Sequence, residues 1–582
     1  DMNQDINTGN PGRKIKNIIM ITILVVTLGL MAFTVYKAIP TSSDGSVPPG
    51  PPGPQGAFLW SLYTPDKSKL STKRKDKVDI NLIKKLKFLT GSNSETQAEG
   101  EEPPSPPPGQ PEESNNTIKT VYIVLFGIEG LIISAIFIYL ILSKCNQTTI
   151  KDTFEKKYKI ILMVLITIAL TVVIVFLDIF IAKKLTGSDE IIYSGKLEIK
   201  ENKEITGGEY TSEKADQIAI LVNGNITVKL QNINVNKIGD SDGGDKTSFY
   251  GINSGIVAKS GAKLTIQNSI ISTSATGGNG VFSYGGSATT NNSESDGTTI
   301  YISDSNITTE KDNSGGIMTT GGGIMNANNL IINTAGISSA AIRSDRGGGI
   351  VNVNGGIYKT TGLGSPTIYS TANITVKNAE LTSTTSEGVI IEGKNSIVLE
   401  QSNLVDTNCE LRMSTIYKNI FIYQSMSGDA ATGVAQFNAT NNKITTNKGD
   451  TIYITNTKTN IYLKNNTFIN NDKEGYFLRA QADYWGNSGA NGGEVILTLD
   501  NQNINGTIGI DSISTLEMNI KSSAFEGIIN TNNTAKLINL IIDENSNITL
   551  MGNSYVSTLN NDIQDNSNIN FSSNSIKFFP SL

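Results

Sequence analysis

The sequence predicts a solenoid of parallel β-strands, and three observations support this fold class. The first is a repeated pattern between residues 315 and 404: an apolar strand, a Gly-rich or polar turn, an alternating strand, a turn centred on Asn and a short third strand. The second is the spacing of the first-strand residues Ile317, Ile342, Ile368 and Ile390, which lie 25, 26 and 22 residues apart. A period of this length is typical of solenoids, and three strands per repeat without a helical pattern favour a coil of strands.

The third observation is a set of columns that stay in step from repeat to repeat. In the second strand, two apolar positions alternate with polar or smaller residues, as a sheet with one buried face requires. The expected inward pairs are Leu264/Ile266, Ile300/Ile302, Met325/Ala327, Val351/Val353, Ile374/Val376 and Ile397/Leu399. Two residues later comes a polar column of Asn268, Asp304, Asn329, Gly355, Asn378 and Gln401. Stacked amides can hydrogen-bond from coil to coil, so the column predicts a ladder; the alternative is chance, because Asn is abundant.

Four segments also carry a family resemblance: GGIMTTGGG, AAIRSDRGGG, YQSMSGDAATG and DSISTLEMN. From about residue 190 to the C-terminus, the chain resembles the right-handed parallel β-helix of the pectin-lyase-like superfamily. It is more closely similar to a group of clostridial membrane-anchored β-helix surface proteins. The superfamily resemblance implies a right-handed, three-sheet helix over residues 190–582 and a bias towards carbohydrate ligands. The closer group implies no particular activity.

Composition limits the chemistry that this chain can perform. The 582 residues carry a net charge of −6 and contain no His, the most common acid–base group and metal ligand in proteins. Lys greatly outnumbers Arg, and no basic cluster with a nucleic-acid motif is present, so we expect no nucleic-acid partner. Catalysis would have to use carboxylates, Lys, Arg, Tyr or a bound hard cation.

The N-terminal third of the sequence predicts a membrane anchor. Three apolar runs are each long enough to cross a hydrocarbon core of about 30 Å. The loop between the second and third runs holds five Lys in 17 residues, so the positive-inside rule places it in the cytoplasm. The expected segments are a cytoplasmic N-terminus (1–17), a first span (18–36), an extracellular Pro-rich and basic linker (37–120), a second span (121–142), the cytoplasmic loop (143–159) and a third span (160–182).

The predicted fold class is therefore an all-β right-handed parallel β-helix, preceded by an α-helical three-span membrane anchor. This topology locates the protein at the plasma membrane, with the β-helix (190–582) and most of the chain outside the cell. The partners expected from it are the membrane and a polysaccharide or cell-surface glycan; the sequence does not indicate an oligomeric state.

Candidate binding residues follow the first-strand anchors. If those anchors point inward, the next residues point outward and form a stripe of Phe282, Met318, Arg343, Tyr369 and Tyr453. Aromatic rings around an Arg suit stacked sugars, with the Arg pairing a uronate or sulfate. The alternative is that the long loops at 237–250, 283–297 and 481–493 fold over the stripe and bury it as a second core. An exposed stripe also predicts that Arg343→Asp leaves the fold intact, whereas Ile342→Asp destroys it.

The acidic loop GDSDGGD suggests a Ca²⁺ cofactor. Asp240, Asp242 and Asp245 could wrap a hard cation, which takes several oxygen ligands. The alternative is a solvated acidic loop, because the loop lacks a full calcium-binding pattern. No other cofactor is indicated.

Three functions remain open at this stage. The first is non-catalytic, adhesin-like binding of polysaccharide or another surface. The second is a polysaccharide lyase or hydrolase acting on acidic glycans. The resemblance to lyases of the superfamily implies that Arg343 or Arg346 would be the base. Such lyases need several carboxylates in adjacent coils to hold calcium, and Asp345 is the only one in that column, which disfavours an enzyme. The third is a structural or self-associating surface rod.

Overall fold

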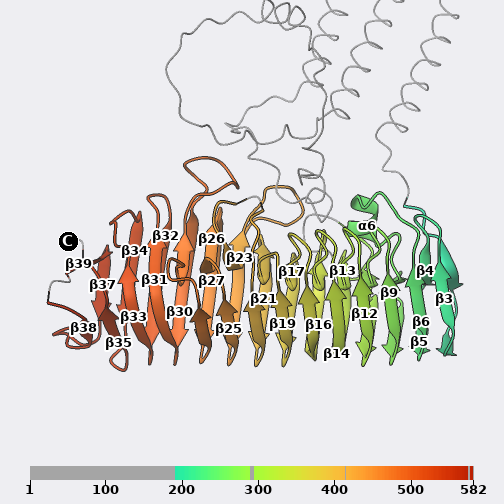
Figure 1. The fold of residues 1–582 in the computed structure, drawn as a ribbon, viewed down its shortest axis with the longest axis horizontal. Coiled ribbons are helices and arrows are strands. Elements are labelled where there is room, and N and C mark those ends of the chain that lie inside the picture. Colours follow the sequence, from blue (N-terminus) through green and yellow to red (C-terminus); the bar gives the residue numbers. More distant parts are fainter. Residues whose placement is uncertain (1–190, 289–293, 413, 575–576, 581–582) are drawn as a thin grey trace, which may run out of the picture. The chain divides into compact units, whose positions relative to one another are not determined.

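The β-helix accounts for all of the chain that the structure describes. The structure is a computed structural model that describes residues 191–288, 294–412, 414–574 and 577–580. These residues belong to one compact unit and contain thirty-nine strands, which pair in parallel. The strands stand side by side along one axis, from β3 and β4 at one end to β37 and β38 at the other (Figure 1).

The first sheet has fifteen strands, one from each coil. At about 4.8 Å per strand it is about 70 Å long. Its strands in order are β1 (Gly195–Ile199), β4 (Ile218–Asn223), β7 (Ile256–Lys259), β10 (Val281–Tyr284), β13 (Ile317–Thr320), β15 (Ile342–Ser344), β17 (Ile368–Ser370), β20 (Val389–Glu392), β23 (Lys418–Tyr423), β26 (Asp450–Thr455), β29 (Leu478–Ala480), β31 (Asn503–Ile510), β33 (Ala524–Ile529), β35 (Asn547–Leu550) and β38 (Ile569–Phe571).

The second sheet has twenty-two strands in two parallel rows. The longer row contains β2 (Lys203–Thr206), β5 (Thr227–Gln231), β8 (Lys263–Gln267), β11 (Thr299–Ser303), β14 (Gly323–Thr334), β16 (Gly349–Thr360), β18 (Asn373–Lys377), β21 (Ser396–Glu400), β24 (Val434–Thr440), β27 (Thr457–Lys464), β30 (Gly493–Asp500), β32 (Thr515–Lys521), β34 (Leu537–Ile542) and β37 (Thr558–Asn561). The shorter row contains β3 (Glu209–Ser212), β6 (Asn234–Lys237), β9 (Ile270–Thr273), β12 (Asn306–Thr309), β19 (Glu380–Ser383), β22 (Asn403–Asp406), β25 (Lys443–Thr446) and β28 (Thr467–Asn470). A separate pair, β36 (Ser554–Val556) and β39 (Phe578–Pro580), lies near the C-terminal end.

The two rows join into one sheet, which corrects the three-sheet architecture expected from the sequence. The central strands β14 and β16 each have twelve residues and pair with both rows. The pairing of β14 with β16 skips only Asn329 and Gly355 at the bend and continues on both sides of it. Three strand segments per coil are present in this region, but they form two hydrogen-bonded sheets.

The core confirms the predicted columns of the second strand. Leu264, Ile300, Met325, Val351, Ile374 and Ile397 are paired in successive coils and buried in one continuous cluster. One first-strand anchor is wrong by a residue: Val389, not Ile390, pairs with Ile368 and enters the core. Because successive strand side chains alternate between faces, this slip places Ile390 on the outer side.

The polar column two residues after the second strand has a backbone cause. Asn268, Asp304, Asn329, Asn378 and Gln401 all have φ between 47° and 55°, and Gly355 has φ of 70°. Asn and Gly tolerate this left-handed conformation best, so the turn selects them. The expected ladder is present in part, because the Asn329 amide donates to Asp304 Oδ1 at 2.8 Å.

The helical part of the predicted fold class requires a correction. In the described ranges there is one helix, α6 (Asp245–Tyr250), and none there has the length and apolar character to cross a bilayer. The expected spans 18–36, 121–142 and 160–182, the linker 37–120 and the loop 143–159 all lie outside the described residues. An apolar run permits a membrane helix without requiring one, and the anchor has no structural support. The fold class that the structure supports is the parallel β-helix alone.

Candidate functional site

The predicted sugar-binding stripe lies on the outer side of the first sheet but is not exposed. The five side chains come from successive or nearby strands, as the register predicted. Exposed fractions are 0% for Phe282, Met318 and Tyr453, 2% for Arg343 and 7% for Tyr369. Of the two arrangements that the sequence left open, the structure shows the second, in which the stripe is buried as an additional core.

Two apolar clusters make up this outer core. One contains Ile218, Leu221, Val257, Phe282, Tyr284 and Met318, with Tyr250 of α6 packed against it. The other contains Ala340, Tyr369, Ile390, Phe421, Tyr423, Tyr453 and Trp485. Trp485 and α6 come from two of the long loops noted in the sequence, and the loops extend from the same side of the sheet (Figure 1). These loops therefore supply a cover over the stripe.

A network of charged side chains lies beneath this cover. Arg343 Nη2 lies 2.7 Å from Asp345 Oδ2, with both side chains at most 3% exposed. Arg346 Nη2 lies 2.6 Å from Asp429 Oδ1, and its guanidinium carbon lies 4.1 Å from the centre of the Phe249 ring in α6. Arg346 therefore links the sheet to α6, and Arg343 Nη2 also lies 3.5 Å from Ser248 Oγ of that helix.

Glu392 is a third buried acid in the same network, and the sequence analysis did not identify it. Its carboxylate accepts hydrogen bonds from Ser425, Tyr369 and Tyr423, the last at 3.1 Å. Burial, with a further contribution from Asp429, raises the pKa of Glu392 to about 8, so it is mostly protonated at pH 7. The signal that could have found it is an acidic residue ending the apolar strand VIIE.

Burial also raises the pKa of Asp345 to about 6, against the opposing effect of Arg343. Asp345 and Glu392 have no exposed surface, and Asp429 is 1% exposed. This is a carboxylate cluster spanning several coils, as an enzyme would need, but a sugar outside the cover could not contact it.

The three aspartates of the suggested calcium site are not brought together. Asp240 pairs with Lys311 at 2.9 Å, and this partner lowers the pKa of Asp240. Asp242 accepts the amide of Gly244 at 3.0 Å, whereas Asp245 begins α6, where burial raises its pKa. Among the described residues, no three acidic, His or Cys side chains are grouped closely enough to hold a metal ion.

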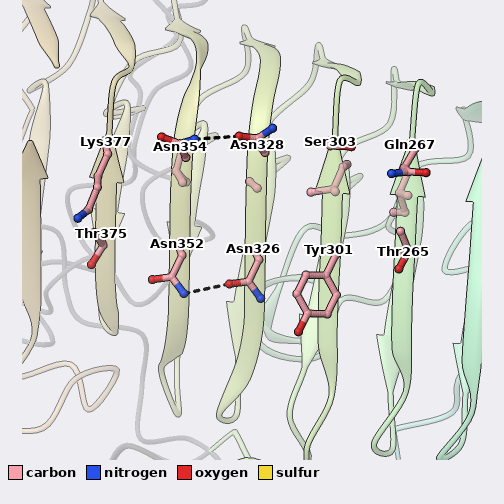
Figure 2. Close-up of a pocket in the computed structure, with 14 residues that line it drawn as sticks. Thr265, Gln267, Tyr301, Ser303, Asn326, Asn328, Asn352, Asn354, Thr375 and Lys377 are labelled. Carbon is pink, nitrogen blue, oxygen red and sulfur yellow. Dashed lines mark hydrogen bonds between the residues drawn. The ribbon is translucent and has the colours of Figure 1, made fainter. Parts of the chain in front are cut away.

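The second sheet carries an open groove. It has a volume of about 520 Å³ and crosses β8, β11, β14, β16 and β18. Figure 2 shows outward side chains in two columns that run across these strands, with one residue of each column on each strand. One column is Thr265, Tyr301, Asn326, Asn352 and Thr375, and the other is Gln267, Ser303, Asn328, Asn354 and Lys377.

Hydrogen bonds between coils hold the amides of this groove in place. Asn352 donates to Asn326 and Asn354 donates to Asn328, each at 3.0 Å (Figure 2). An Asn amide has two donor and two acceptor positions, so each ladder bond leaves others free to bind a ligand. Tyr301 adds an aromatic ring that is 52% exposed.

The groove lacks the groups that acid–base catalysis needs. Of its fourteen lining residues, all described, none is acidic and only Lys377 is basic. Lys377 pairs with Glu400 at 2.8 Å, so its charge is already balanced. The surface is therefore uncharged, polar and repetitive, with one exposed ring.

Comparison with known proteins supports the fold. Residues 361–492 match the family model described as the right handed beta helix region. The chain contains a right-handed β-helix. The comparisons with curated proteins and with solved structures found no match. The resemblances to the pectin-lyase-like superfamily and to the clostridial group are therefore carried by the sequence segments alone.

Proposed function

We propose that this β-helix is a non-catalytic, adhesin-like protein that binds an uncharged polysaccharide along the groove of the second sheet. The observation that carries the proposal is the run of outward polar side chains across five strands about 4.8 Å apart, with four amides of β14 and β16 fixed by ladder hydrogen bonds. A polymer lying parallel to the coil axis would meet side chains able to hydrogen-bond on every one of these strands.

The chemistry of the lining supports a sugar as ligand. Sugar hydroxyls both donate and accept hydrogen bonds, and the free amide positions of Asn326, Asn352 and Asn354 can do the same. The exposed Tyr301 ring offers an apolar face for the C–H groups of a sugar ring. The resemblance to pectin-lyase-like β-helices is consistent with this class, and we propose an extracellular location for the same reason.

Because the groove is uncharged, we propose an uncharged polysaccharide in place of the acidic ligand suggested by the sequence. That suggestion relied on Arg343, which is buried and paired. A lyase or hydrolase would need a carboxylate in contact with the bound sugar, and the buried positions of Asp345 and Glu392 do not provide one. The geometry therefore favours binding without turnover.

The proposal can be tested by affinity gel electrophoresis of the full chain. The gels would contain xylan, β-1,3-glucan, hydroxyethyl cellulose or pectate. We expect at least one uncharged polymer to slow migration, and Tyr301→Ala and Asn352→Ala to weaken this effect about fivefold or more, which corresponds to about 1 kcal/mol of lost contact per variant. Tyr462→Ala is the matched control, because Tyr462 lies in the same row of strands but outside the groove.

Two results would contradict this function. One is retardation by pectate alone, which would restore an acidic ligand. The other is equal binding by the wild type and the Tyr301→Ala variant, which would remove the groove from recognition.

A further inference from the structure

The outer column of the first sheet becomes accessible beyond the end of its cover. Arg479 of β29 pairs with Gly509 of β31, and the amide of Asn530 bonds to the carbonyl of Ile508 at 2.8 Å, so Asn530 stands at the equivalent place in the next coil. A pocket of about 150 Å³ opens around these three residues. It is separate from the groove, which lies on the other sheet.

Arg479 is held in one orientation at the pocket wall. Its Nε lies 2.6 Å from Asp450 Oδ2, and its Nη2 lies 3.0 Å from Asp450 Oδ1. The Asp450 side chain is 1% exposed, whereas that of Arg479 is 22% exposed. The described residues give Nη1 no hydrogen-bond partner, so this end of the guanidinium can donate to a ligand.

Tyr476 forms an aromatic part of the same wall. The Arg479 guanidinium lies 3.8 Å from the centre of its ring. A Cβ atom on Gly509 would lie 2.4 Å from the ring, so only glycine lets the tyrosine lie this close to the sheet. Gly509 does not have a positive φ, and close packing with Tyr476 therefore explains the glycine.

Asn530 provides a fixed donor one coil beyond Gly509. It has φ of 50°, and its Oδ1 accepts the amide and the hydroxyl of Thr534 at 3.0 and 3.2 Å. The residue is 5% exposed, and its Nδ2 makes no hydrogen bond to the described residues and is not among their fully buried unpaired atoms, so solvent can reach it. An amide nitrogen held this way at a pocket wall can donate to a ligand in place of water.

Asp511 completes the pocket with an acceptor. Its carboxylate accepts the amide of Ala482 at 2.8 Å and that of Ile513 at 3.2 Å, which fixes its position. A carboxylate oxygen has more than one acceptor position, so Asp511 can bind a further donor. The pocket therefore presents two donors, one acceptor and an aromatic ring.

We propose that this pocket binds a single neutral sugar ring, such as a terminal or branch residue of a glycan. Neighbouring hydroxyls on such a ring both donate and accept, which matches Asp511 as the acceptor and Arg479 and Asn530 as the donors. The negative charge of Asp511 disfavours binding of an anionic ligand, and the positive charge of Arg479 disfavours binding of a cationic one. The small volume admits one ring, and the site is independent of polymer binding in the groove.

Saturation-transfer NMR on the full chain tests this site. The probes are the methyl glycosides of glucose, galactose, mannose and N-acetylglucosamine. We expect transfer to at least one of them and a loss of at least tenfold in affinity for Asn530→Asp, which keeps the capping oxygen but removes the free donor. Asn533→Asp is the matched control, because Asn533 belongs to the same turn, has φ of 52° and does not line the pocket.

Arg479→Lys gives an independent test that keeps the charge opposite Asp450 while removing the planar fork. We expect this variant to bind the same glycoside with lower affinity. Absence of transfer to every probe with the wild type would overturn the proposal, as would equal affinities of the Asn530→Asp and Asn533→Asp variants. Loss of polymer binding in Tyr301→Ala with glycoside binding intact would identify two separate sites.

Discussion

The outer sides of the two sheets show how the same strand pattern can lead to opposite surfaces. The first sheet directs Phe282, Arg343 and Tyr453 outward, and the long loops bury them. The second sheet directs Tyr301 and Asn352 outward, and they remain in an open groove. Alternation along a strand determines which side chains leave the core, but loops between strands determine which of those reach solvent. The covered side holds charged pairs and aromatic rings, whereas the open side holds amides.

The largest effect is expected where a side chain enters the central core. Ile342 has no exposed surface and pairs with Ile317 and Ile368, so Ile342→Asp would place a charge in the stack without a partner. We expect no soluble, folded protein. Ile357→Asp is the matched control, because Ile357 is 51% exposed on the second sheet, and this variant should fold. Circular dichroism of the purified variants would show the difference; a folded Ile342→Asp protein would refute the assigned register.

The next largest effect on stability is expected from breaking a charge pair on the covered side, compared with breaking one on the open side. Arg343→Ala leaves Asp345 buried without its partner, which typically costs about 3–5 kcal/mol. Lys377→Ala removes a pair with Glu400 that is partly exposed, and such pairs contribute about 0–1 kcal/mol. Urea unfolding of the two variants measures this. Equal stabilities would mean that the cover does not exclude water, and would restore the exposed stripe that the sequence allowed.

A pH effect is expected from Glu392 beneath the cover. Its pKa is about 8 in the folded protein and about 4.5 in the unfolded chain, so the folded state holds a proton that the unfolded state has lost between these values. Stability should therefore fall as pH rises from about 4.5 to about 8, by up to about 1.4 kcal/mol per unit. Glu392→Gln should remove the slope that Glu392 contributes between about pH 6 and 8, because Asp345, with a pKa of about 6, adds to the slope mainly below that range. Parallel slopes in urea titrations of the two proteins would show that Glu392 stays ionised.

The smallest effect is expected on the open side. Asn354 donates to Asn328 and accepts from Asn378, so Asn354→Ala removes two exposed ladder bonds. We expect a loss of about 1 kcal/mol, because water replaces much of each bond, and about half of that for Asn328→Ala. Thermal melts would measure both. A loss above that of Arg343→Ala would reverse the comparison and make the ladder the main support of the helix.

The sequence predicted the repeat unit well because every coil faces the same geometric demands. Apolar pairs such as Leu264/Ile266 and Val351/Val353 are required wherever a strand faces the core, and the polar column reflects a turn with positive φ. The register failed where consecutive apolar residues, Val389 and Ile390, offered two equivalent choices. A single strand contains no information that separates the core from a second apolar layer.

The sequence by itself therefore determined the coil, its core columns and the absence of histidine chemistry. Only the tertiary structure decided that Arg343 and Tyr369 are covered, that Asp240, Asp242 and Asp245 lie apart, and that Asn530 faces a pocket with Arg479. The physical reason is the distance along the sequence between the residues that interact. Core columns arise from interactions between equivalent positions one coil apart, whereas accessibility depends on where loops from distant coils come to rest, and no periodic pattern encodes that.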